Sequence, residues 1–144
     1  MADARLNVSR IREKVADIKE NLAVLKEYAD QDENNFLSNK EAIRSARYAL
    51  VVMIEASVNI ANHLCARLLN SSPGSYADCF LLLGNNEIIP VELSLKLAKM
   101  AGFRNLLVHG YAKVDNRKML EIMRVNNVDV ERWLKELQNV LSLK

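Results

Sequence analysis

The stretch NKEAIRSARYALVVMIEASVNIANHLCARLL, residues 39–69, decides the fold of this chain. It predicts one long helix of roughly 45 Å, at a rise of about 1.5 Å per residue. Its centre, residues 49–54, is apolar on every face, and a helix of that kind is normally buried on several sides. The stretch therefore predicts either the central helix of a bundle or a helix buried in a second subunit.

The segment before this stretch predicts an amphipathic helix. Apolar residues recur there at steps of three and four on a mostly charged background: Val8, Ile11, Val15, Ile18, Leu22 and Leu25. Such a narrow, heptad-like stripe suits either the core of the chain or a dimer seam. A polar run at residues 30–35 ends this helix, and Ser38 with Glu41 has the spacing of a capping box for the long helix.

Turn-forming residues divide the second half of the chain. The strongest break is NSSPGS, residues 70–75. A short helix is expected over residues 76–83, with Gly84 as its C-terminal cap. Pro90 suits the first turn of the next helix.

The helix that follows Pro90 is expected to run to about His109, where Gly110 can end it. Asp115 then predicts the N-cap of a last helix, which Asn126 and Asn127 are expected to kink or split. Four glycines and two prolines are too few for the many turns of an all-β fold. The predicted fold is all-α, an up-and-down bundle of four main helices with one or two short extra helices, in a single domain over residues 1–144.

Composition places the chain among soluble cytoplasmic proteins. The apolar run at residues 48–54 is far too short to span a membrane, and the charged residues 1–8 do not resemble a signal peptide. Cys65 and Cys79 lie among apolar residues and are expected to be buried thiols. Twenty basic and 18 acidic residues leave a net charge of +2, so any contact with nucleic acid must be a local patch.

The segment that carries chemistry is GFRNLLVHGY, residues 102–111. Asn105 and His109 are four residues apart and share a helix face, while Arg104 lies about 100° round and can swing its long side chain to the same cleft. A guanidinium grips phosphate with two parallel hydrogen bonds, and an imidazole exchanges protons near neutral pH. Because RNA supplies its own 2′-hydroxyl nucleophile, such a group of side chains could cleave a strand without a metal or other cofactor.

A plainer interpretation of the same residues is that Arg104 forms a surface ion pair and His109 caps the end of its helix. His63 is expected to be a structural histidine, and neither histidine has a partner at metal-ligand spacing. Basic residues that follow the motif, Arg117 and Arg124 among them, either guide an RNA backbone or are simply solvated.

Residues 104–111, RNLLVHGY, match R-x4-H-x-Y, and through this motif the chain resembles the HepT-like toxins of the HEPN superfamily. Neighbouring segments resemble the family too: IEA at 54–56, IANH at 60–63, SYADCF at 75–80 and KMAGF at 99–103. The resemblance covers residues 39–143. It implies a helical bundle that forms a homodimer, in which two copies of the motif face one shared cleft.

The resemblance also implies a function and roles for individual residues. Many members of the superfamily are metal-independent ribonucleases. HepT-like members resemble toxins paired with a small nucleotidyltransferase antitoxin, MntA, which silences the toxin by transferring AMP from ATP to the motif tyrosine. Carried onto this chain, Arg104 and His109 are the catalytic pair, Asn105 fills the polar position after the arginine, and Tyr111 is the modification site.

One position departs from the family pattern. The resemblance implies an aspartate, present in many relatives, in the long helix where Asn59 stands here, so this chain is expected to be weaker or to differ in substrate. Glu55, Asn59 and Asn62 recur at steps of four and three, so they share one face. That face either lines the cleft beside Arg104 or is solvated.

Two functions therefore compete at this level. One is a metal-independent endoribonuclease toxin whose substrate is RNA. The other is a non-catalytic helical subunit that binds a nucleotide or substrate for a nucleotidyltransferase. A fold alone cannot separate them, because function lies in the site.

Overall fold

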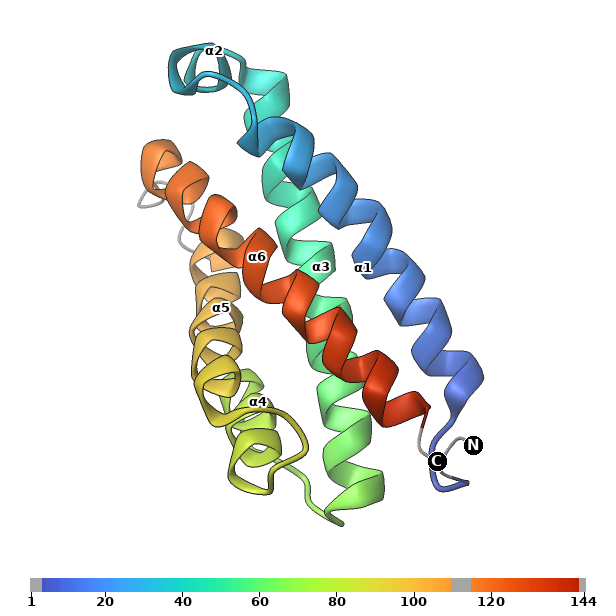
Figure 1. Cartoon of the computed structure of the whole chain (residues 1–144). Helices are drawn as coiled ribbons and strands as arrows, with labels where there is room; N and C mark the ends of the chain where they lie inside the picture. The colour runs from blue at the N-terminus through green and yellow to red at the C-terminus, as the bar shows by residue number, and fades with distance from the viewer. Residues whose placement is uncertain (1–3, 110–114, 143–144) are drawn as a thin grey trace.

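Residues 4–109 and 115–142 are described by the computed structural model, and over these residues the chain forms six helices and no strand. Four helices are long and alternate in direction, as Figure 1 shows. They are α1 (Val8–Ala29), α3 (Lys40–Leu68), α5 (Val91–His109) and α6 (Asn116–Leu141). Two are short, α2 (Glu33–Leu37) and α4 (Tyr76–Asn85). This confirms the predicted all-α, up-and-down bundle with four main helices and two extra ones.

The long helix α3 is the central element of the bundle. It packs against α1 along its length and also contacts α2, α4 and α5. By length and composition α3 could cross a membrane, but 61% of its apolar window is buried inside the protein, as in the core helix of a soluble protein. Of the two alternatives for residues 39–69, the central bundle helix is therefore the correct one.

The apolar stripe of α1 faces the core of the same chain. Ile11, Ile18, Leu22 and Leu25 are buried there. The alternative of a dimer seam for this stripe is wrong, because α3 already covers it.

Asn7, the residue before α1, is hydrogen-bonded to His63 of α3. The backbone N–H of Asn7 donates to Nε2 of His63 at 3.1 Å, which requires an unprotonated nitrogen. Partial burial, followed by the charges of Arg67 and Arg10, lowers the pKa of His63 and favours this neutral form. The prediction of a structural histidine is confirmed.

The start of α3 differs from the predicted capping box. Its N-cap is Asn39, whose side chain accepts from the N–H of Ala42 at 3.0 Å. Ser38 instead ends α2, and Glu41 pairs with Arg44. The sequence interpretation missed α2, a short helix that begins in the polar run and is anchored in the core by Phe36, with Leu37 packed beside it.

Two further local predictions are wrong for reasons of packing. Gly84 lies inside α4 rather than capping it. A glycine is needed there because α5 approaches so closely that a Cβ at Gly84 would lie 2.1 Å from Oγ of Ser94. Asn126 and Asn127 do not split α6, which is continuous and buries both side chains. The N-cap at Asp115 is confirmed, since its carboxylate accepts from the N–H of Arg117.

Two buried thiols and a pair of aromatic rings lie where α4 contacts α3 and α6. Cys65 and Cys79 are both free and buried, as predicted. Sγ of Cys65 donates to the carbonyl of Cys79 at 3.3 Å, and burial raises the pKa of Cys65 to about 11. The rings of Phe80 and Trp133 meet edge to face at 5.4 Å, which joins α4 to α6.

Candidate functional site

The second half of α5 directs Arg104 toward the bundle rather than toward solvent. Arg104 shares a helix face with Met100 and Leu107, both buried, and its own side chain is only 22% exposed. A charge in this position needs a partner, because an unpaired buried charge is strongly destabilising.

That partner is Glu55 of α3. Nε of Arg104 lies 3.0 Å from Oε1 of Glu55, whose side chain is 35% exposed. The buried Nε–H is not directed at the oxygen, so the contact is an ion pair rather than a hydrogen bond. Glu55 therefore lies beside Arg104, and its role in lining a cleft stays a prediction.

Tyr76, the first residue of α4, completes the cluster. Its hydroxyl donates to Oε1 of Glu55 at 2.9 Å, and the Arg104 guanidinium lies over its ring, 5.4 Å from the centroid. The hydrogen bond to Glu55 raises the pKa of Tyr76, with burial as a further cause. Sequence reasoning missed this residue, although it lies in the quoted segment SYADCF, because only the tertiary structure brings α4 beside α5.

Asn105 and His109 lie on a different side of α5. Both side chains are exposed, whereas Arg104 is half-buried. Arg104 and His109 are five residues apart, which turns them by about 140° around a helix of 3.6 residues per turn. The structure joins Arg104 to Asn105 by a weak hydrogen bond of 3.4 Å from Nη1 to Oδ1. It does not direct Arg104 and His109 to the same point within one chain.

The remaining residues of the predicted site are only partly placed. Asn62 is exposed on α3 and its Oδ1 accepts from Sγ of Cys79 at 3.9 Å, so it faces α4 rather than Arg104. Asn59 is half-buried on the same helix. Tyr111 and Gly110 lie outside the described residues.

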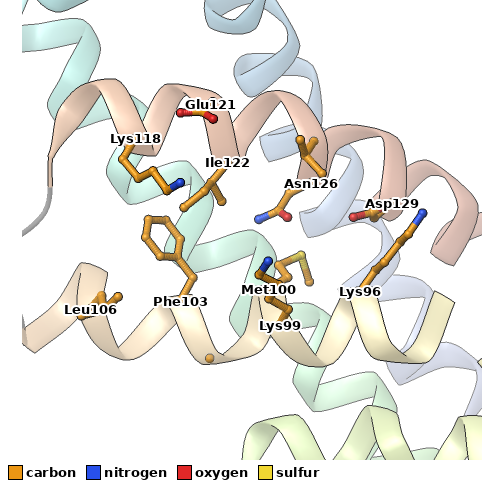
Figure 2. A pocket seen from close by; sticks show the side chains of 12 residues that line it. Lys96, Lys99, Met100, Phe103, Leu106, Lys118, Glu121, Ile122, Asn126 and Asp129 are labelled. Carbon is orange, nitrogen blue, oxygen red and sulfur yellow. The ribbon is translucent and has the colours of Figure 1, made fainter. Parts of the chain in front are cut away.

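A groove of about 640 Å³ runs between α5 and α6 next to the motif. Figure 2 shows the ring of Phe103 standing in it, opposite Ile122. Leu106, 50% exposed, lies at one end of the groove and follows Asn105 directly in sequence. Apolar side chains such as Met100, Phe103 and Ile122 share the lining of the groove with charged residues of both signs: Lys96, Lys99, Lys118, Glu121 and Asp129.

Two of the basic residues after the motif, Arg117 and Arg124, contact other parts of the chain. Arg124 donates to the carbonyls of Ala29 and Gln31, both at 3.0 Å, and so caps the end of α1. Arg117 pairs with Glu33 at 3.4 Å. These contacts favour neither the RNA-guiding interpretation nor simple solvation for the two arginines.

A comparison with protein-family models matches residues 18–137 to the family described as ribonuclease HepT-like. The chain belongs to the ribonuclease HepT-like family. The mRNA nuclease HepT of Shewanella oneidensis is 34% identical over 80 residues, which are 56% of this chain and 60% of that protein. The tRNA nuclease HepT of Aphanizomenon flos-aquae is 28% identical over 91 residues, 63% of this chain and 62% of that protein. This HepT-like chain thus matches about three fifths of the length of these curated relatives.

Solved structures share the fold of this HepT-like chain over most of its length. The tri-AMPylated Shewanella oneidensis HEPN toxin, solved in complex with its MNT antitoxin, is 28% identical, with a TM-score of 0.81. That match covers 90% of this chain and 96% of the toxin. YutE of Bacillus subtilis, a cytosolic protein, has a TM-score of 0.82 over 98% of this chain and 93% of its own, but at 17% identity it shows the fold alone.

Proposed function

We propose that this HepT-like protein is a metal-independent endoribonuclease toxin of a toxin–antitoxin pair, acting in the cytoplasm. The observation that carries the proposal is the motif on α5, where Arg104 is held by Glu55 and Tyr76 while Asn105 and His109 are exposed beside it. The naming of curated relatives as mRNA and tRNA nucleases supports RNA as the substrate class.

The proposed reaction uses the 2′-hydroxyl of RNA as nucleophile. The imidazole of His109 accepts the proton of this hydroxyl, and the 2′-oxygen attacks the adjacent phosphorus. The bond from phosphorus to the 5′-oxygen breaks, the leaving oxygen takes up a proton from water, and a 2′,3′-cyclic phosphate remains. His109 then gives its proton back to solvent. Arg104 stabilises the charge that builds on the phosphate oxygens, and Asn105 orients the phosphate.

The same proposal includes a homodimer with a composite cleft. Arg104 and His109 of one copy are turned apart around α5, so two copies that meet along α5 can combine the arginine of one motif with the histidine of the other. The groove between α5 and α6 supports this arrangement, because it exposes Leu106 beside the motif and carries charges of both signs. A two-fold interface needs such a self-complementary surface.

The variant Leu106→Glu is expected to separate the dimer, because it replaces an exposed apolar side chain of the proposed interface with a charge. Light scattering should give about twice the 16.3 kDa chain mass for the wild type and the chain mass for the variant. Tyr48→Glu is the matched control, since Tyr48 is 71% exposed on α3 and lies outside the groove. A wild-type protein that remains monomeric at micromolar concentration would contradict the interface.

A nucleotidyltransferase antitoxin of the MntA type is the proposed partner, and Tyr111 the residue it modifies. The relative solved as a tri-AMPylated toxin with its MNT antitoxin supports this assignment. Each AMP adds an anionic phosphodiester and a base two residues from His109, where it can pair with Arg104 and occupy the place of the RNA phosphate.

Incubation with such an antitoxin and ATP is expected to add about 329 Da per AMP, measured by intact-protein mass spectrometry. The Tyr111→Phe protein should gain no mass, while the exposed Tyr48→Phe protein should be modified like the wild type. Equal modification of wild type and Tyr111→Phe would refute the assignment.

A non-catalytic nucleotide-binding subunit is the second candidate. The departure at Asn59 from the pattern that the resemblance implies favours it. One experiment separates the candidates: incubation of the purified wild-type protein with RNA in the presence of a metal chelator. Cleavage supports the nuclease, and nucleotide binding without cleavage supports the subunit.

A further inference from the structure

Arg104 is held on three sides by residues that come from three different helices. Glu55 of α3 engages Nε, the ring of Tyr76 of α4 lies under the guanidinium plane, and Asn105 of α5 accepts from Nη1. Nη1 makes only the weak 3.4 Å hydrogen bond to Asn105, so the Nη edge can take up a further partner. This edge lies on the solvent side, since Asn105 is exposed.

Tyr76 also restrains Glu55. Its hydroxyl lies 2.9 Å from Oε1 and 3.3 Å from Oε2, so one donor serves both oxygens of the carboxylate. Because Tyr76 is the first residue of α4 and directly follows the N-cap Ser75, its backbone is fixed by the helix start. The carboxylate that contacts Arg104 is thereby held from α4 as well as from α3.

We propose that Glu55 and Tyr76 are positioning residues that hold the Arg104 guanidinium with its Nη edge toward the RNA phosphate. This inference rests on the proposed nuclease function. Neither residue touches the substrate. They restrict the rotamers of the long Arg104 side chain before the phosphate binds. The entropy cost of ordering this side chain is therefore not part of the barrier to reaction.

A purely structural ion pair would have different consequences. If Glu55 only neutralised a half-buried arginine, its loss would lower stability but would leave correctly folded enzyme with normal turnover. A positioning role predicts a split between the kinetic constants. In Glu55→Gln a negative charge near the phosphate is removed, so KM should not rise, while kcat should fall because the guanidinium is no longer oriented.

The experiment compares Glu55→Gln and Tyr76→Phe with two matched controls on α3. Glu41→Gln removes a carboxylate that also pairs with an arginine but is largely exposed, and Tyr48→Phe removes an exposed hydroxyl. For Glu55→Gln we expect kcat for RNA cleavage to fall between about 10- and 100-fold with KM unchanged or lower. Tyr76→Phe keeps the ring under Arg104 and loses only the hydroxyl, so a smaller fall of up to about tenfold is expected. Both controls should match the wild type.

A second readout does not depend on cleavage. In NMR relaxation experiments the Nε–H of Arg104 should be ordered in the wild type and in both controls, and mobile in Glu55→Gln. If the wild type does not cleave RNA, the proposed nuclease function fails, and this measurement still decides whether Glu55 orders the guanidinium. An Nε–H that stays ordered in Glu55→Gln, or a folded variant with unchanged kcat, would overturn the positioning role.

Discussion

Replacing Arg104 with alanine should reduce RNA cleavage by between about a hundredfold and a thousandfold, the effect expected when a group that stabilises charge in the transition state is removed. His109→Ala should lower the rate of RNA cleavage by a factor between about 10² and 10⁴, the range for loss of a general base. Initial rates on a labelled RNA, measured with a chelator present, check both values. The double variant should lose little more than the worse single one, because residues that act as a unit are not additive.

Arg104→Lys tests what kind of group the site needs. Lysine keeps the positive charge but lacks Nε and the planar fork, so it can neither rest on the Tyr76 ring in the same way nor bind phosphate with two parallel bonds. We therefore expect it to retain less than about a tenth of the wild-type rate. Full activity of Arg104→Lys would mean that charge alone suffices.

Arg104→Ala has a second consequence that must be measured separately. It leaves Glu55 half-buried without its cation, and the protein should therefore be less stable than the wild type. Thermal melting and circular dichroism of each variant show whether loss of activity reflects loss of fold. Arg44→Ala, which removes an exposed arginine of α3, is the control for both properties. If the folded Arg104→Ala protein cleaves RNA at the wild-type rate, Arg104 takes no part in the reaction.

Replacing Gly84 with alanine is expected to destabilise the protein by about 3 kcal/mol, the upper end of the usual range for overpacking. The new Cβ would lie 2.1 Å from Oγ and 2.5 Å from Cβ of Ser94. Ser94 cannot simply turn away, since its Oγ donates to the carbonyl of Val91 at 2.7 Å and its Cβ is itself in the way. Helices α4 and α5 would have to separate, and this contact is one of the most extensive in the bundle.

The melting temperature of Gly84→Ala should therefore fall by about 10 °C, at roughly 2–4 °C per kcal/mol for a chain of this size. Adding Ser94→Gly removes both clashing atoms and should restore part of the loss. Gly74→Ala is the matched control, because nothing lies within 4 Å of a Cβ there and no glycine described has a positive φ. Equal melting temperatures of Gly84→Ala and Gly74→Ala would contradict the close packing of α4 against α5 at Gly84.

Periodicity was sufficient to predict the long helices of this protein. The stripe of α1, the apolar centre of α3 and the cap at Asp115 each express a local rule, since hydrophobic spacing and end residues determine where a helix forms. The motif on α5 was also readable, because Arg104, Asn105 and His109 are close in sequence. Local rules failed at α2, which begins in a polar run and is held in the core by Phe36 and Leu37.

The arrangement of the candidate site was decided by tertiary structure. Gly84 has the residue type of a helix cap, but it is needed for the close approach of α5, which no local pattern encodes. The same approach brings Tyr76 of α4 to Glu55 and Arg104. The sequence by itself determined the helices and the chemical groups of the motif. Only the packing of α3, α4 and α5 decided which way Arg104 points, because a half-buried charge takes the direction in which a carboxylate can meet it.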